Sequence, residues 1–235
     1  MFEVLDVRRC EMKYRISTAC AGRLRQLIAQ VLPADEHNGN GKPSYLVRSL
    51  YFDSMIDSDL SDKINGLETR KKIRLRIYSH QDTVVKLEIK QKDGNWQRKQ
   101  SVKLSKKDAL LLIQGDYSPL LQLNQSLAER LYHIMTQDTY RPKCIVEYQR
   151  SAFVVPTNDT RITFDTHLSA TESCYDLFAE NLALYPVGWL DDVTLEVKYN
   201  HFMLSYVRDL LESVDKTSVS YSKYVMSRYM SHYTV

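Results

Sequence analysis

Apolar and charged residues alternate along three consecutive segments within residues 71–103. In the middle segment, for example, Leu87 and Ile89 alternate with lysine and glutamate. A period of two places successive side chains on opposite faces of a β-strand. Each segment is therefore predicted to be a strand with one apolar and one cationic face, and Asp93-Gly94 is suited to the hairpin turn between the second and third strands.

The same alternation returns in three other segments, where carboxylates are interleaved with the cations. Residues 10–16, 161–168 and 194–200 each carry charged side chains on one face and apolar side chains on the other. Two further segments, 45–53 and 143–155, are rich in aromatic and β-branched residues and are predicted to be strands as well. The chain is thus expected to be rich in strands.

Apolar residues at helical spacing occur between several of these strands. Ser17 or Thr18 can cap the first helix, and Gly66 and Gly115 are suited to end the second and third helices. The apolar stripes of such helices must be buried, and the outer surface of a sheet would bury them. Helices are predicted over residues 18–31, 57–65, 105–114, 119–137 and 201–211 and again after residue 222, with a less regular, strand-prone stretch at 173–187.

The charge of the chain is distributed unevenly. The formal net charge of the 235 residues is only +3, which argues against a generic nucleic-acid binder. Between Lys63 and Lys107, however, 14 lysines and arginines accompany only four carboxylates. A dense local group of cations on a nearly balanced chain indicates a confined anionic ligand.

Several observations bear on domain organisation and location. Apolar residues make up 43% of the chain, enough for a sizeable core, and no repeat or linker divides it, so residues 1–235 are predicted to form one domain. Neither a membrane-spanning run nor a signal-peptide segment is visible. The four cysteines are scattered, without a CxxC pair, and are expected to be reduced thiols in a cytoplasmic protein. Membrane association would then require a partner protein.

The charged strand faces can be arranged in two ways. Either they all face water, or the sheet closes so that they face one another and its apolar faces point outward beneath the helices. In the second arrangement carboxylates offset part of the buried positive charge, and a polyanion with a divalent metal would offset the rest. The residues concerned are Glu11, Lys13, Arg15, Arg74, Arg76, Glu88, Lys90, Lys103, Arg161, Asp165, Glu196 and Lys198.

A resemblance to a known family favours the closed arrangement. The chain resembles the polyphosphate polymerase domain of the vacuolar transporter chaperone (VTC) family, which belongs to the triphosphate tunnel metalloenzymes. Each motif alone is weak, but the ordered set covers residues 8–230 and is specific. The motifs are EMKY (11–14), SLYFDS (49–54), KIRLRIY (72–78), KLEIKQK (86–92), EYQR (147–150), RITFDT (161–166), LEVKY (195–199) and SKY (222–224).

The resemblance implies an α+β fold, an antiparallel β-barrel tunnel with a charged lumen and amphipathic helices packed on its outside. It also implies binding of ATP, inorganic polyphosphate and Mn²⁺ or Mg²⁺, and transfer of the ATP γ-phosphoryl group to a growing polyphosphate chain. Arginine forks and lysine point charges suit this chemistry, because phosphoryl transfer depends on positioning and charge stabilisation. The aromatic residues lack the stacking pattern of an RNA-binding sheet, so no nucleic acid is expected.

The resemblance also implies a role for individual residues. Glu196 would hold the metal, whereas Glu11 and Glu88 are either further metal ligands or salt-bridge partners of nearby lysines. Lys198 is included among the substrate-binding residues because it shares a strand face with Glu196. The catalytic residues would be Lys13, Arg74, Arg76, Lys90, Arg161 and Glu196. The substrate-binding residues would be Lys13, Arg74, Arg76, Lys90, Lys103, Arg150, Arg161, Lys198, Ser222 and Lys223.

The sequence departs from the family pattern at two positions. Related triphosphatases and cyclases have an ExExK motif, but Arg9 replaces its first carboxylate here, which favours a polymerase over a two-metal hydrolase. Ser220 stands where a further lysine is expected. Two functions compete with polymerisation: an inorganic triphosphatase or polyphosphatase that uses the same tunnel, and a polyphosphate-binding module without activity.

The position of Arg150 conflicts with simple alternation. It falls on the same strand face as Val146 and Tyr148, so it is expected to reach the lumen only through a bulge or a twisted strand end. Four charged residues that receive no role in the predicted site are interpreted as surface or rim charges. They are Arg15, Lys72, Lys86 and Lys92.

Overall fold

One large antiparallel sheet organises the chain. The computed structural model describes residues 10–35, 38, 43–94, 96–155, 158–188, 191–200, 202–220 and 222–233. Its strands are hydrogen-bonded in the order β10-β1-β9-β7-β6-β2-β3-β4-β5, and β8 pairs with β7. The strands are β1 Cys10–Ser17, β2 Tyr45–Asp53, β3 Arg70–Ile77, β4 Val84–Asp93, β5 Trp96–Ser105, β6 Arg141–Val155, β7 Thr160–Thr171, β8 Tyr185–Pro186, β9 Asp192–Tyr199 and β10 Thr217–Ser218.

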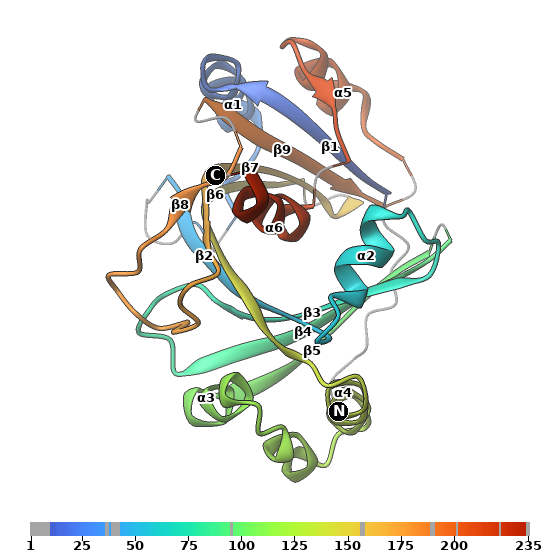
Figure 1. The fold of residues 1–235 in the computed structure, drawn as a ribbon. Coiled ribbons are helices and arrows are strands. Elements are labelled where there is room, and N and C mark those ends of the chain that lie inside the picture. Colours follow the sequence, from blue (N-terminus) through green and yellow to red (C-terminus); the bar gives the residue numbers. More distant parts are fainter. Residues whose placement is uncertain are drawn as a thin grey trace.

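The sheet is strongly curved but not closed, which corrects the expectation of a complete barrel. Within the described residues, the two end strands β5 and β10 do not pair. Figure 1 shows β3–β5 on one side of the molecule and β1 and β9 on the opposite side, with β2, β6 and β7 between them. Lys90 of β4 and Glu11 of β1 nevertheless form an ion pair, with 3.1 Å between Nζ and Oε2. Charged faces of strands far apart in the sheet therefore meet, as predicted.

Helices cover the outer, apolar face of the sheet at both ends. α3, η2 and α4 pack against β2–β5, and α1 and α5 pack against β1, β7 and β9 (Figure 1). Ser17 caps α1 as expected, and Ser105 caps α3, because each side chain accepts a backbone N–H from the first turn. The helices are α1 Thr18–Val31, α2 Ser58–Ile64, α3 Lys106–Gln114, the 3₁₀-helix η2 Ser118–Leu123, α4 Ser126–Gln137, α5 Ser205–Glu212 and α6 Lys223–Tyr233.

The apolar faces predicted from alternation are buried beneath these helices. Leu75 and Leu87 are fully buried together with Leu112 of α3. At the other end, Leu195 is fully buried with Leu24 of α1. Burial at about 25 cal/mol per Å² of apolar surface makes these outer layers the main source of stability.

α6 contradicts the expectation that all helices lie outside. α6 lies against the inner face of the sheet, as Figure 1 shows. Its Tyr224 is buried with Tyr51 of β2 and with Val146 and Tyr148 of β6. The middle strands are therefore buried on both faces, which explains why their sequences are apolar without clear alternation.

Three predicted elements differ in extent. The helix expected over 119–137 is divided into η2 and α4, because Asn124 between them adopts a left-handed conformation with φ 48°. The stretch 173–187 contains only the short strand β8. α5 begins at Ser205, and His201, where that helix was expected to start, lies outside the described residues, as does Arg9.

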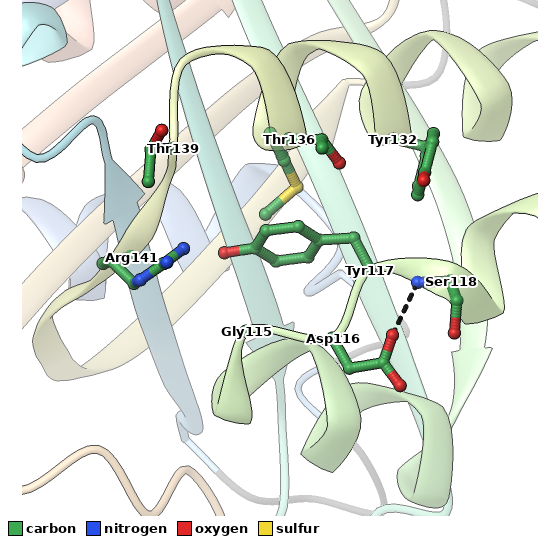
Figure 2. Close-up of a pocket in the computed structure, with 9 residues that line it drawn as sticks. Gly115, Asp116, Tyr117, Ser118, Tyr132, Thr136, Thr139 and Arg141 are labelled. Atoms are coloured by element: carbon green, nitrogen blue, oxygen red, sulfur yellow. Dashed lines mark hydrogen bonds between the residues drawn. The ribbon is translucent and has the colours of Figure 1, made fainter.

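A pocket of about 280 Å³ lies among α3, η2 and α4 (Figure 2). Its lining includes Tyr117, Arg141 and Asp116, whose carboxylate accepts the Ser118 N–H at 2.9 Å. The pocket lies in the outer layer and contains none of the predicted site residues. No helix in the described ranges has both the length and the hydrophobicity needed to cross a membrane.

Candidate functional site

The first charged group on the inner face is the Glu88 cluster, defined as Glu88, Arg74, Arg76 and Lys99. Arg74 lies directly opposite Glu88 in the β3–β4 register, and Lys99 reaches the same carboxylate from β5. The distances from the Glu88 carboxylate are 2.8 Å to Arg74, 3.6 Å to Arg76 and 2.5 Å to Lys99. Three cations thus share one buried carboxylate.

The environment of Glu88 keeps it ionised. Burial alone would raise the pKa of Glu88, but Arg74, Arg76 and Lys99 outweigh that effect and lower the pKa far below its ordinary value. Arg74 also donates a hydrogen bond to the Tyr51 hydroxyl at 2.9 Å. These contacts fix the guanidinium groups before any ligand is bound.

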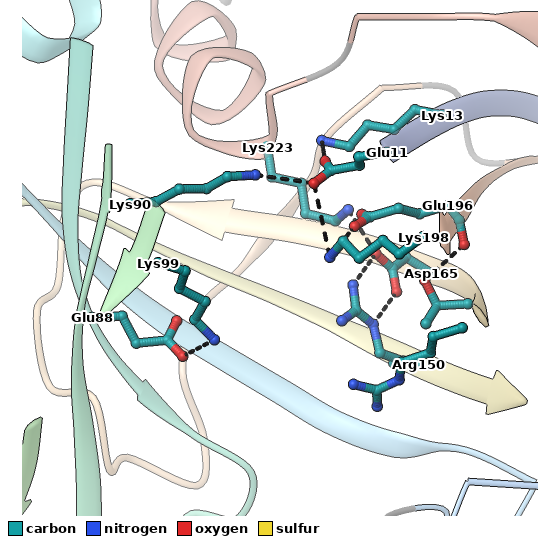
Figure 3. Close-up of polar contacts among 12 residues, drawn as sticks. Glu11, Lys13, Glu88, Lys90, Lys99, Arg150, Asp165, Glu196, Lys198 and Lys223 are labelled. Carbon is teal, nitrogen blue, oxygen red and sulfur yellow. Dashed lines mark hydrogen bonds and ion pairs between the residues drawn. The ribbon is translucent and has the colours of Figure 1, made fainter. Parts of the chain in front are cut away.

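The second group is the Glu11–Glu196 cluster, defined as Glu11, Glu196, Lys13, Lys90 and Lys198. Glu11 and Lys13 of β1 lie opposite Lys198 and Glu196 of β9. The Glu11 carboxylate is 2.8 Å from Lys13 and 3.1 Å from Lys90, and Glu196 forms an ion pair with Lys198. Figure 3 shows these side chains converging from different strands.

Both carboxylates of this cluster remain ionised. Burial and the charge of Glu196 would raise the pKa of Glu11, but Lys13, Lys90 and Lys198 lower it to about 2. For Glu196, burial is likewise outweighed by Lys198 and Lys13, and its pKa lies well below the ordinary value.

The third group is the Asp165 cluster, defined as Asp165, Arg150 and Lys223. Arg150 donates two hydrogen bonds to the Asp165 carboxylate, at 2.6 and 2.8 Å, and the Lys223 ammonium lies 2.7 Å away. Burial would raise the pKa of Asp165, but Arg150 and Lys223 lower it to about 2. Both cations also lie over the Tyr148 ring.

Arg150 reaches the inner face without the distortion of β6 that was expected. Alternation does place it with Val146 and Tyr148, but this face of β6 is the inner one, partly covered by α6. The β6–β7 register does shift, and the extra residue lies in β7, where His167 has φ 53°. The error came from assuming that every apolar strand face points outward.

The remaining predicted residues lie toward the margins of the inner face. Arg161 of β7 contacts the Asp35 carboxylate and the Tyr45 hydroxyl, both at 3.0 Å. Lys103 of β5 lies opposite Lys86 of β4 and is exposed near the open edge of the sheet. Ser222, just before α6, accepts a hydrogen bond from Lys72.

The carboxylates of the three clusters do not form one metal centre. In the part of the chain that is described, no three His, Cys, Asp or Glu side chains are arranged as a metal site. Glu88 lies apart from Glu11 and Glu196 (Figure 3) and is surrounded by its own cations. Glu11 and Glu196 still fit a hard divalent ion, because Mg²⁺ commonly uses one or two carboxylates and completes its shell with phosphate and water.

Two inner-face cations were missed or misplaced from the sequence. Lys99 lies beside Glu88, and Lys72, which was expected at the surface or rim, lies opposite Lys90 on the inner face. Extending the alternation of 73–77 back by one residue would have found Lys72. Extending the alternation back from Lys103 would likewise have found Lys99, because residues 99 and 103 lie on the same face of β5, opposite the buried Val102.

Comparisons with known proteins identify related sequences and folds. The VTC domain family matches residues 8–232. The chain is similar to the structure of a candidate adenylate cyclase from Bacillus halodurans, with 12% identity, a TM-score of 0.50 and coverage of 97% of this chain and 98% of that chain. A candidate adenylate cyclase from Vibrio parahaemolyticus has 14% identity, a TM-score of 0.46 and coverage of 94% and 98%. No curated protein sequence matches.

Proposed function

Because this chain belongs to the VTC domain family, we propose that it is a metal-dependent polyphosphate polymerase, which transfers the γ-phosphoryl group of ATP to a growing inorganic polyphosphate chain. The family and the tunnel-like fold support a function on polyphosphate or triphosphate. The polymerase activity itself is the proposal.

The observation that carries the proposal is the meeting of cations from opposite ends of the sheet. Lys90 of β4 and Lys13 of β1 both contact Glu11, although five strands, β9-β7-β6-β2-β3, lie between β1 and β4 in hydrogen-bonding order. A single exposed cationic strand would serve many anions weakly. An inner face lined by cations on both sides suits a linear polyanion, which presents phosphate oxygens in every direction.

The residues divide the work of phosphoryl transfer. Arg74 and Arg76, fixed by Glu88, would hold phosphate oxygens of one reactant, and Arg150 and Lys223, fixed by Asp165, would hold those of the other. A terminal phosphate oxygen of the chain forms a bond to the γ-phosphorus while the bond from that phosphorus to the β–γ bridging oxygen breaks. ADP leaves with the electron pair, and the chain is longer by one phosphate. Neither serine nor cysteine is needed as nucleophile.

Glu11 and Glu196 would hold the divalent ion. When bound, Mn²⁺ or Mg²⁺ neutralises charge on the phosphate oxygens and aligns the reacting groups. The depressed pKa values of both carboxylates keep them ionised and able to bind a cation at neutral pH. Lys13 and Lys198, which pair with these carboxylates here, would then be released to contact phosphate.

The test is to incubate the purified chain with ATP, Mn²⁺ and a short polyphosphate primer, and to measure ADP and the length of the chains. Long polyphosphate formed together with ADP supports the polymerase. Orthophosphate released from tripolyphosphate, without chain growth, would show a hydrolase instead. Polyphosphate binding without any product would show a binding module.

A further inference from the structure

Lys72 is the only β3 lysine whose register partner across the β3–β4 pair is itself a lysine on the inner face, Lys90. Its side chain is partly buried, and its ammonium donates a hydrogen bond to the hydroxyl of Ser222, at the start of α6. Lys72 thus joins β3 to α6 on the inner face. The family motifs assign it no role, and its place in the sequence gave it only the role of a rim charge.

The neighbours of Lys72 are cations. Lys13 of β1, Lys63 of α2, Lys90 of β4 and Arg74 of β3 all act on it electrostatically. Within the described ranges, no carboxylate forms an ion pair with Lys72, and Glu11, which pairs with the register partner Lys90, is also held by Lys13. The cations of the three clusters differ, because each of them lies against Glu11, Glu88, Asp165 or Glu196.

The charged form of a lysine is destabilised in such surroundings. Burial, followed by repulsion from Lys13 and Lys63, lowers the pKa of Lys72 to about 7. A group kept at this cost, at a site made of convergent cations, is a candidate for binding an anion. A phosphate placed among Lys72, Lys13 and Lys90 would reverse the repulsion and bring the ammonium its missing counter-ion.

We propose that Lys72 is a further phosphate-binding residue, which holds one phosphate of the polyphosphate chain between β3 and the start of α6. The inference rests on the proposed polyphosphate function and extends it with a new contact. Because the anion stabilises the charged form of Lys72, binding takes up a proton. Affinity is then greatest below pH 7 and declines as pH rises above it.

Other charged groups near Lys72 can also contribute to the pH dependence of binding. The groups that act on it are Lys13 of β1, Lys63 of α2, Arg74 of β3 and Lys90 of β4. One step further away, Lys90 pairs with Glu11, and Lys223, the residue after Ser222, pairs with Asp165. The pKa of Lys99, whose side chain is about half exposed, is also lowered, to about 8, by partial desolvation and by the two arginines, which outweigh the opposing effect of Glu88. The contribution of Lys72 must therefore be isolated by substitution.

The experiment measures binding of linear inorganic polyphosphate by calorimetry, in buffers of different ionisation enthalpy at fixed ionic strength, so that protons taken up are counted. We compare the unaltered chain with Lys72→Met, Lys72→Arg and the matched control Lys107→Met, an exposed lysine of α3 on the outer layer. Lys72→Met should bind about 10-fold more weakly, as expected for losing one hydrogen-bonded charge. It should also take up fewer protons between pH 7 and 8.

The other variants separate charge from structure. Lys72→Arg should keep the affinity but lose the proton uptake, because arginine stays charged. Without ligand, Lys72→Met should melt at the same temperature as the unaltered chain or higher, since it removes a repelled charge. Lys107→Met should match the unaltered chain throughout.

Two results would overturn the inference. Equal affinity and equal proton uptake in Lys72→Met and the unaltered chain would exclude a phosphate contact at Lys72 while leaving the polymerase proposal intact. Failure of the unaltered chain to bind polyphosphate at all would overturn both proposals.

Discussion

The Glu88 cluster and the Glu11–Glu196 cluster use the same residue types in different proportions. In the first, one carboxylate is shared by Arg74, Arg76 and Lys99. In the second, the two carboxylates Glu11 and Glu196 lie among lysines. Asp165 lies close enough to Glu196 for the negative charge of Glu196 to oppose, in part, the lowering of the Asp165 pKa by Arg150 and Lys223. The first cluster is a set of cations aligned by one anion. The second has two carboxylates that could also bind a metal ion. The following predictions test this difference between the clusters.

The largest expected effect comes from Glu196→Gln. If Glu196 holds the metal, this change removes a charged ligand and should lower Mn²⁺-dependent turnover at least about 100-fold, because metal stabilisation of the transferring phosphate contributes several kcal/mol. Polyphosphate should still bind. Turnover and half-saturating Mn²⁺ are measured with ATP and a primer.

Glu88→Gln is the matched control for that prediction. It removes the same charge from the other cluster, so activity should fall through misplaced arginines while the half-saturating Mn²⁺ concentration stays the same. A variant of Glu196 that kept full activity, or a Glu88 variant with the altered metal requirement, would reverse the two assignments.

Asp165→Asn should have an intermediate effect, on stability. The pKa of Asp165 lies at about 2 in the folded chain against an ordinary value of 3.8. This depression corresponds to about 2 kcal/mol of stability at pH 7. Because the folded pKa is lowered, the contribution is present above pH 4 and is lost as pH falls toward 2. Denaturant unfolding at several pH values should show the variant less stable at pH 7 and the gap closing in acid.

Asp209→Asn, an exposed carboxylate of α5, provides the control for Asp165 with the same change in charge. Its unfolding curve should stay close to that of the unaltered chain. If the Asp165 gap persisted unchanged at pH 2, the carboxylate would not be the source of the stability difference.

The smallest effect is expected for Lys99→Met. The side chain of Lys99 is 52% exposed, so its ion pair with Glu88 is screened by solvent and should contribute less than about 1 kcal/mol to stability. Arg74 and Arg76 would still hold Glu88. A large loss of stability on thermal or denaturant unfolding would mean that the lysine, and not the arginines, organises this cluster.

Alternation in the sequence was sufficient where a strand is buried on one face only. It placed Arg74, Glu88 and Lys90 together on the inner face and Leu75 and Leu87 beneath helices, as the structure shows. The Ser17 cap of α1 could also be predicted from the sequence, because capping depends on one local side chain.

Alternation was insufficient where contacts between distant segments decide the structure. The inner face of β6 is apolar because α6 covers it, and nothing local to Arg150 or Tyr148 reveals a helix some 75 residues later along the chain. The family resemblance nevertheless assigned Arg150 to the site, although alternation placed it on an apolar strand face. It could not show that Asp165 holds Arg150 and Lys223, because that geometry depends on the bulge in β7.

Within the described residues, strands near opposite ends of the sheet are linked by side chains, and the end strands β5 and β10 form no backbone hydrogen bonds with each other. The ion pair between Lys90 and Glu11 is one such link. A bound phosphate chain would compete with Glu11 for the Lys90 ammonium. A polyanion that binds Lys90 in place of Glu11 would therefore break this ion pair between β4 and β1. If polyphosphate binds as proposed, we expect the space inside the sheet to widen at the expense of this one ion pair, while every strand keeps its neighbours.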